Sequence, residues 1–263
     1  MSEAVFQEGR QLYGEQRFSE AAERWGRAAL LQHGPSFAHL SNMLIEGRPG
    51  VALDKKRAFE LAEAGAALDC AHSKGALGYC YVMAYGVAKD VGRGLALGRE
   101  SAAAGSCFGQ VVVGWCYRHG CGGVAQDDAE AVRLYRLSAA QGYAEAQNNL
   151  GYLFENGKGV AQDYAEAVRL YSLAVAQGHP PAQSNLGTMF FYGKGVAKDY
   201  AEVVRLFRLA AAQGLAVAQL WLGTMFETGQ GVAKDRAEAI RWYRLAAAQG
   251  DQNAQVKLRR LGA

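Results

Sequence analysis

The sequence predicts an all-α protein, a right-handed α-solenoid of stacked antiparallel helix pairs. Three observations predict this class. A glycine that follows leucine in most units recurs in steps of 36 or 37 residues, at Gly78, Gly114, Gly151, Gly187 and Gly223. A glutamine–glycine pair closes the later intervals, with its glycine at 142, 178, 214 and 250. Apolar residues inside each interval follow helical spacing, and a period of this length is typical of stacked supersecondary units.

The first helix of the most regular unit is expected over residues 144–157. Its small and apolar residues, among them Ala146, Leu150 and Phe154, fall on one helical face. Gly151 costs about 1 kcal/mol inside a helix relative to alanine. Because this glycine recurs, we expect it to allow a neighbouring helix to approach closely. The loop with Gly157 and Gly159 then ends the helix.

The second helix of the unit is expected to begin after Asp163, with Glu166 completing a capping box. Leu170 and Tyr171 lie on its apolar stripe, and Gly178 is expected to end it. Neither helix can bury its stripe alone, so neighbouring units must stack. The same capping pair occurs in three other units, as Asp127/Glu130, Asp199/Glu202 and Asp235/Glu238.

The repeated pattern is A-x-A-Q-x-x-L-G-x-x-F/Y, then G-x-G-V, D-x-x-E-A and A-A-x-Q-G. It fits residues 107–251 closely and residues 36–106 loosely. The pattern resembles the Sel1-like repeat family, a branch of the tetratricopeptide superfamily. The resemblance implies a solenoid in which the first helix of each unit lines an inner groove, and it implies a role in protein interaction.

The expected organisation is one repeat domain over residues 1–263. Residues 3–35 resemble a plain tetratricopeptide unit that caps the N-terminus, and residues 36–106 form two degenerate repeats. Four regular repeats follow over residues 107–251, and residues 252–263 form a C-terminal cap whose basic residues are expected to face water. The run Val91-Gly92-Arg93-Gly94 is expected to weaken the start of one second helix.

Composition narrows the function classes. A net charge of +3 with 20% charged residues gives no strong case for nucleic acid or an anionic membrane surface. No stretch reaches the roughly 18 apolar residues of a membrane span, and the N-terminus lacks an apolar signal core. Cys80 and Cys116 occupy equivalent positions and are expected to be small core residues. No cysteine follows residue 121, so we expect a cytoplasmic or other reducing intracellular compartment.

Three motifs have chemical alternatives. The Gly157-Lys158-Gly159 loop lacks the strand and hydroxyl residue of a phosphate-binding loop, and we interpret it as a turn. Cys116, His119 and Cys121 have a metal-like composition, but the spacing does not support a closed zinc site. No cofactor, metal or catalytic constellation is expected, so we do not expect an enzyme. An arginine column is expected to be a solvated ladder or, alternatively, a basic strip: Arg133, Arg169, Arg205 and Arg241.

The candidate partner-binding residues flank the glycine column on the first helices, where the resemblance places the concave groove. Asn149 and Asn185 are equivalent and could bond an extended peptide's backbone, while the aromatic residues could be anchors. Alternatively, the aromatic side chains pack between adjacent units. The twelve residues are Trp115, Arg118, His119, Asn149, Tyr152, Glu155, Asn185, Thr188, Tyr192, Trp221, Thr224 and Glu227.

The expected function is a non-catalytic scaffold or adaptor that binds a protein partner, as a peptide or helical segment, in the concave groove. A first alternative is an architectural subunit of a larger assembly that uses the convex face and the loops. A second is a small-ligand-binding or hydrolase-like protein, and RNA binding is disfavoured by the near-neutral charge.

Overall fold

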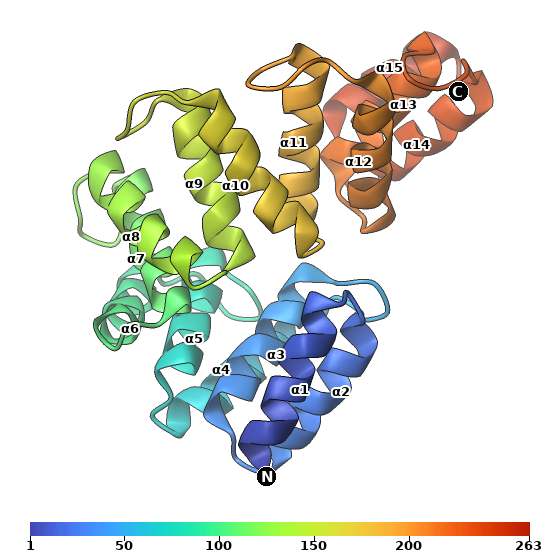
Figure 1. Ribbon diagram of the computed structural model, residues 1–263. Coiled ribbons are helices and arrows are strands. Elements are labelled where there is room, and N and C mark those ends of the chain that lie inside the picture. The colour runs from blue at the N-terminus through green and yellow to red at the C-terminus, as the bar shows by residue number, and fades with distance from the viewer. The chain divides into compact units, whose positions relative to one another are not determined.

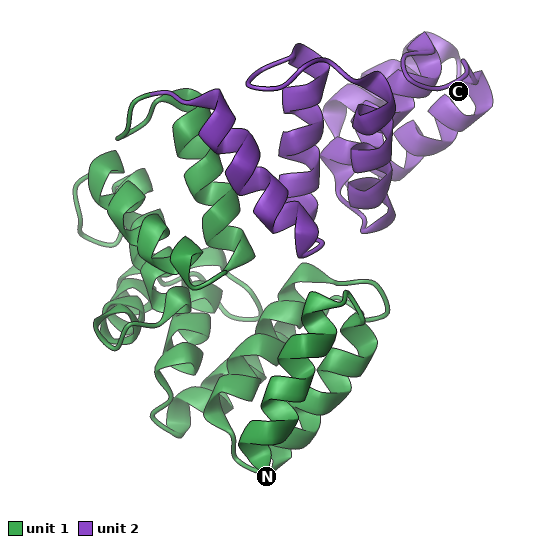
Figure 2. Cartoon of the chain, viewed as in Figure 1, with its two compact units in different colours: residues 1–161 green, residues 162–263 purple.

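The computed structural model describes residues 1–263, which form fifteen α-helices and no strand. In number and order, the helices correspond to the seven predicted helix pairs followed by one C-terminal helix (Figure 1). This confirms the predicted all-α class and the number of helix pairs. The chain divides into two compact units, residues 1–161 and residues 162–263 (Figure 2).

Unit 1 contains the first nine helices, and consecutive helices pack against each other along the chain. The helices are α1 (Ser2–Gly14), α2 (Phe18–Leu30), α3 (Gly34–Glu46), α4 (Lys55–Ala67), α5 (Ala71–Met83), α6 (Val91–Ala103), α7 (Cys107–His119), α8 (Asp128–Ala140) and α9 (Ala144–Asn156). The odd-numbered members are the first helices of their pairs, and α5 packs against both α3 and α7.

Unit 2 contains the remaining six helices and repeats the same alternation. They are α10 (Tyr164–Ala176), α11 (Pro180–Tyr192), α12 (Tyr200–Ala212), α13 (Ala216–Thr228), α14 (Arg236–Ala248) and α15 (Gln252–Leu261). Its core is built from buried residues of α12, α13 and α14, and Ala254 of α15 joins it.

In three units, the recurring glycine (Gly114, Gly187 or Gly223) lies where an aromatic ring of the second helix meets the first helix. A methyl group added at Gly223 would lie 2.6 Å from Cε1 of Tyr243, and one at Gly114 would lie 2.8 Å from Cε1 of Tyr135. Both tyrosines are fully buried. The predicted packing reason for the glycine is therefore confirmed, because any side chain would collide with the ring.

The second helices begin as predicted, at an aspartate that accepts a backbone hydrogen bond. Oδ1 of Asp163 accepts from the Glu166 amide at 3.0 Å. The glutamate then accepts a hydrogen bond from the arginine three residues later. In one unit, Nη2 of Arg169 donates to Oε1 of Glu166 at 2.7 Å. All four arginines of this column are more than half exposed, which confirms the solvated ladder.

The expectation of a weak start for the second helix near residue 91 is wrong. α6 begins at Val91, because Asp90 caps it by accepting from the Arg93 amide at 2.9 Å. Gly94 serves packing, since an added methyl group would lie 2.7 Å from the Gly78 carbonyl oxygen. Two glycines therefore let α5 and α6 approach each other closely.

The N-terminal pair α1–α2 is joined to the next pair by a buried arginine. The Arg48 side chain is fully buried and donates to Glu46 at 2.5 Å and to the Tyr13 hydroxyl at 2.8 Å. Its guanidinium also lies over the Phe18 ring, at 5.3 Å from the centroid. The loop after α3 thereby contacts both helices of the first pair.

Two further predictions concern single residues and segments. Cys80 and Cys116 are fully buried, which confirms their place in the core. Burial raises the pKa of each thiol to about 12.

The Gly157-Lys158-Gly159 segment forms a turn, as predicted. No helix combines the length and apolar character needed to cross a membrane.

Candidate functional site

In unit 1, the candidate residues of α7 contact one another and α9. The Trp115 ring stacks on the His119 ring at a centroid distance of 4.2 Å, and Nδ1 of His119 lies 2.8 Å from the Trp115 carbonyl oxygen. The Arg118 guanidinium lies over the Tyr152 ring at 4.3 Å. Arg118 and Tyr152 therefore join α7 to α9, whereas Trp115 and His119 contact each other within α7.

The amide of Asn149 is engaged inside its own helix. Asn149 is only 8% exposed and donates to Oε1 of Glu145 at 2.9 Å. The equivalent Asn185 is partly buried on α11, and Glu155 is partly buried near the end of α9. On α11, Thr188 donates to the Ser184 carbonyl at 2.8 Å. The two asparagines thus lie in different environments.

Trp221 of α13 combines packing with partial exposure. Its ring stacks on Phe207 at 5.6 Å with an interplanar angle of 12°, and its edge meets Phe191 at 5.1 Å. Tyr192 contacts it from 6.5 Å and is itself 51% exposed. The ring face of Trp221 is therefore used for packing between helix pairs, while the residue stays only partly buried.

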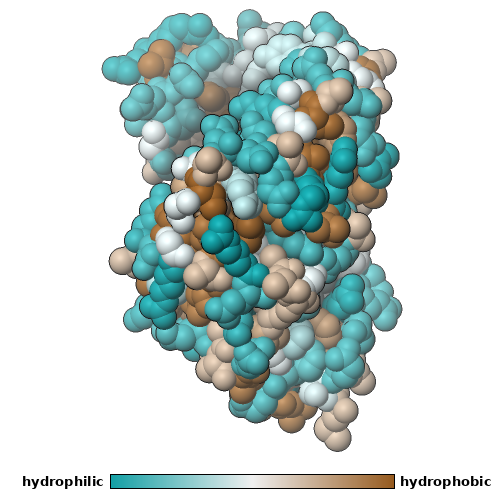
Figure 3. Space-filling model, turned by 90° about the vertical axis from the view of Figure 1, so that its left-hand side faces the viewer, coloured by the Kyte–Doolittle hydropathy of each residue, from teal (hydrophilic) through white to brown (hydrophobic).

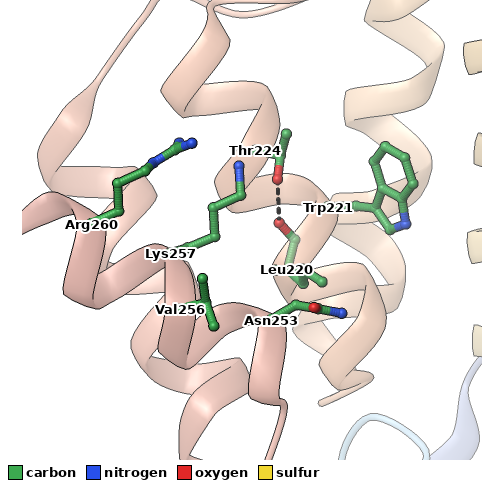
Figure 4. Close-up of a pocket in the computed structure, with 7 residues that line it drawn as sticks. All are labelled: Leu220, Trp221, Thr224, Asn253, Val256, Lys257 and Arg260. Atoms are coloured by element: carbon green, nitrogen blue, oxygen red, sulfur yellow. Dashed lines mark hydrogen bonds between the residues drawn. The ribbon is translucent and has the colours of Figure 1, made fainter.

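A hollow of about 380 Å³ lies between α13 and α15 (Figure 4). From α13 come Leu220, Trp221 and Thr224, and the opposite wall comes from α15. Figure 4 shows the Lys257 and Arg260 side chains rising from α15 on the side of the hollow facing α13. The lining thus combines apolar side chains from both helices with two cations from α15. The residues from α15 are Asn253, Val256, Lys257 and Arg260.

Glu227 lies at the centre of a hydrogen-bond network beside this hollow. Its Oε2 accepts from the Tyr243 hydroxyl at 2.6 Å and from Nζ of Lys257 at 3.0 Å, and its Oε1 accepts from Arg260. Burial opposes ionisation of Glu227, but hydrogen bonds from Tyr243, Lys257 and Arg260 outweigh it and hold the pKa below its ordinary value. The tyrosine hydroxyl also lies 3.2 Å from Oγ1 of Thr224.

A second hollow of about 590 Å³ adjoins the first and shares Lys257 and Arg260 with it. Lys234 and Arg236 add two further cations to its lining, and Glu227 is its acidic member. Arg236 donates to the Leu261 carbonyl and so also contacts the end of α15.

The α15 residues of these hollows are not among the predicted site residues, because they were expected to face water in a C-terminal cap. The signal was nevertheless present in the repeat register. Lys257 stands 36 residues after Trp221, and Arg260 stands 36 residues after Thr224. α15 is therefore the first helix of one more repeat, and its Lys257 and Arg260 line a hollow together with Trp221 and Thr224 of α13.

The metal-like cluster does not form a ligand set in this structure. Cys116 is buried, and the Cys121 thiol donates to the Cys116 carbonyl at 3.8 Å. His119 is instead stacked on Trp115. No group of three or more histidine, cysteine, aspartate or glutamate side chains is arranged to hold a metal ion.

Apolar residues on the surface are dispersed. On the face drawn in Figure 3, brown apolar residues form small clusters between teal polar ones.

The repeat architecture places the chain in a family. A family model for the Sel1 repeat matches six segments, at residues 38–70, 73–106, 108–143, 144–179, 180–215 and 216–251. The chain belongs to the Sel1 repeat family. Sel1 repeat proteins generally act as protein-interaction scaffolds and are typically non-catalytic.

Solved structures of Sel1 repeat proteins share the fold. A Sel1 repeat protein from Oxalobacter formigenes is 29% identical with a TM-score of 0.64, over 99% of this chain and 76% of that one. The protective antigen c5321 of uropathogenic Escherichia coli is also 29% identical, with a TM-score of 0.60. The match includes 99% of this chain but only 56% of the length of c5321.

A more distant structure shows the fold alone. The immunity protein Pa5087 from Pseudomonas aeruginosa is 19% identical with a TM-score of 0.55, over 82% of this chain and 81% of that one. Among curated proteins, none matches the chain.

Proposed function

We propose that this Sel1 repeat protein is a non-catalytic scaffold that binds a peptide or helical segment of a protein partner on the first helices of its unit 2. The observation that carries the proposal is the hollow between α13 and α15, where Trp221 meets Val256 and Lys257. Its volume of about 380 Å³ lies in the range of small binding pockets.

The composition of this hollow supports recognition of a protein segment. Tryptophan and arginine are enriched among residues that dominate binding energy at protein interfaces. Leu220 and Val256 supply apolar area beside Trp221, and the amide of Asn253 and the charged ends of Lys257 and Arg260 supply polar contacts. An apolar anchor with a polar rim is the usual anatomy of such an interface.

Affinity capture followed by mass spectrometry tests the proposal. The native chain is compared with Val256→Glu, which places a carboxylate in the hollow at a residue that is 54% exposed and so tolerates substitution. Leu209→Glu is the matched control, because Leu209 is also exposed but lies on a second helix. We expect a partner that is lost with Val256→Glu and retained with Leu209→Glu. Retention by both variants would contradict binding at the hollow.

A second candidate function is an architectural role through the second helices. In unit 2 three leucines at steps of 36 residues, Leu173, Leu209 and Leu245, are each 40–42% exposed. Leu209 also lines a hollow of about 350 Å³ together with Arg205, Arg208 and Val232. A partner lost with Leu209→Glu and retained with Val256→Glu would favour this second function.

A further inference from the structure

We infer that the hollow between α13 and α15 binds an acidic peptide segment, and that Glu227 is an internal carboxylate that competes for the same cations. This inference rests on the proposed function, because it names the chemistry of the partner bound there.

The charge of the lining favours an anionic partner. The two adjoining hollows are lined by four cationic side chains and one carboxylate, that of Glu227. The cations are Lys234, Arg236, Lys257 and Arg260. The two hollows together have a surplus of three positive charges, which attracts carboxylates and repels a basic segment.

The geometry leaves the two shared cations able to take a second acceptor. A lysine ammonium has three donors and a guanidinium has five. Lys257 donates to Oε2 of Glu227 at 3.0 Å, and Arg260 donates to Oε1. Their side chains remain 28% and 62% exposed, whereas that of Glu227 is 16% exposed. An incoming carboxylate would meet the accessible side of both cations.

The apolar wall indicates what should accompany the acidic groups. Leu220, Trp221 and Val256 line the side of the hollow next to Lys257. Trp221 is only partly buried although one face of its ring stacks on Phe207, so its accessible part can pack against a large apolar side chain in the hollow. The segment that fits is therefore an aromatic or large aliphatic residue flanked by aspartate or glutamate.

Glu227 is the residue that separates this inference from a purely structural role of the network. As a structural tie, its carboxylate attaches α15 to α13, and its loss would loosen one wall of the hollow. As a competitor, its carboxylate partly neutralises Lys257 and Arg260, and its loss would strengthen binding of an acidic segment. The two roles predict opposite changes in affinity when Glu227 becomes glutamine.

Fluorescence anisotropy with labelled pentapeptides tests the inference on the full chain. The probe is Glu-Glu-Trp-Glu-Glu, and its controls are Gln-Gln-Trp-Gln-Gln and Lys-Lys-Trp-Lys-Lys. We expect the acidic probe to bind about tenfold more tightly than the neutral one, with affinity falling as salt is raised. Glu227→Gln should tighten binding of the acidic probe about threefold, and Arg260→Gln should weaken it about tenfold. Arg169→Gln, which removes a cation of the exposed ladder, should leave it unchanged.

Other outcomes would overturn the inference. Equal affinities for the acidic and neutral probes would overturn it. So would a Glu227→Gln variant that has the melting temperature of the native chain but binds the acidic probe more weakly. If Glu227→Gln has a lower melting temperature than the native chain, the ratio of its affinity for the acidic probe to its affinity for the neutral probe is compared with the native ratio. A higher ratio supports the inference, and a lower ratio overturns it. If the two probes bind equally and Val256→Glu abolishes binding of the neutral probe, the inference of an acidic partner fails, but the proposal of a scaffold that binds at the hollow stands. Partner capture that Val256→Glu does not affect would contradict both proposals.

Discussion

The side-chain amide of Gln213 donates to Oε1 of Gln183 at 3.0 Å. The same nitrogen lies 3.1 Å from the Gly178 carbonyl, at the end of the preceding helix pair. One residue of the closing glutamine–glycine motif thereby joins the second helix, the first helix and the preceding turn. Equivalent bonds link Gln141 with Gln110 and Gly105, and Gln249 with Gln219 and Gly214.

Gln213→Ala should lower the free energy of unfolding by about 1–2 kcal/mol, because it leaves buried acceptors on Gln183 and Gly178 without their donor. The midpoint of urea unfolding measures this. Gln255→Ala is the matched control, since Gln255 is exposed on α15, and it should change stability by less than about 0.5 kcal/mol. Equal effects of the two substitutions would show that the glutamine bonds do not stabilise the repeat.

Alanine substitutions at two helical glycines should have opposite effects. Gly223→Ala should destabilise the protein by about 1–3 kcal/mol, because the new methyl group would lie 2.6 Å from the Tyr243 ring. Gly26→Ala should stabilise it by up to about 1 kcal/mol, because Gly26 lies inside α2 with open space around it. Thermal unfolding of both variants checks this, and a shift of the same sign in both would refute the packing account.

Ala84 adopts a left-handed backbone conformation at the end of α5, with φ of 58°. Glycine takes the equivalent place after α9, at Gly157. Ala84→Gly should therefore raise the free energy of unfolding by about 0.5–1 kcal/mol, since glycine adopts positive φ without a Cβ clash. In contrast, Ala64→Gly, at an exposed position inside α4, should lower it by about 1 kcal/mol. Denaturant midpoints distinguish the two, and a loss of stability in Ala84→Gly would contradict the expectation.

His39 is surrounded by aromatic rings in unit 1. Its ring centroid lies 4.8 Å from that of Trp25 and 5.4 Å from that of Phe108, which also contacts His72. Burial also lowers the pKa of His72. Burial lowers the pKa of His39 to about 3. The neighbouring positive charges of His72, Arg10 and His33 act in the same direction.

Acid should therefore destabilise unit 1 through His39. The unfolded state binds the proton near pH 6.5 and the folded state only near pH 3, so stability is complete above pH 6.5 and falls between these values. One such proton contributes a slope of up to about 1.4 kcal/mol per pH unit. Unfolding free energies measured from pH 7 to pH 4 should show a smaller slope for His39→Leu than for the native chain. An unchanged slope would assign the acid sensitivity to other groups.

Much of the fold follows from the sequence because each repeat carries its own local signals. Asp163 and Asp199 cap their helices as the capping motif predicts, and the spacing of Gly114 from Tyr135 encodes the close packing. The start of α6 was mispredicted because helix propensity alone gave Gly94 a cost, while its packing against Gly78 depends on a tertiary contact. The single-domain organisation stays a prediction.

The candidate site could be predicted only in part. Trp221 and Thr224 do line a hollow, but the hollow depends on Lys257 and Arg260 from α15. Sequence reasoning assigned those basic residues to solvent because they replace apolar residues of the repeat. Which side chains meet across α13 and α15 is decided by the register of stacked helices, and the burial of Asn149 against Glu145 likewise required the structure.

Photo-crosslinking from a single residue tests the central claim most directly. Benzoylphenylalanine replaces Val256 in the hollow in one variant and Leu209 on a second helix in another. Each variant is mixed with the partner found by affinity capture, and the mixture is irradiated. We expect a covalent adduct with the partner from position 256 and none from position 209. An adduct from position 209 alone would contradict it and would place the interface on the second helices.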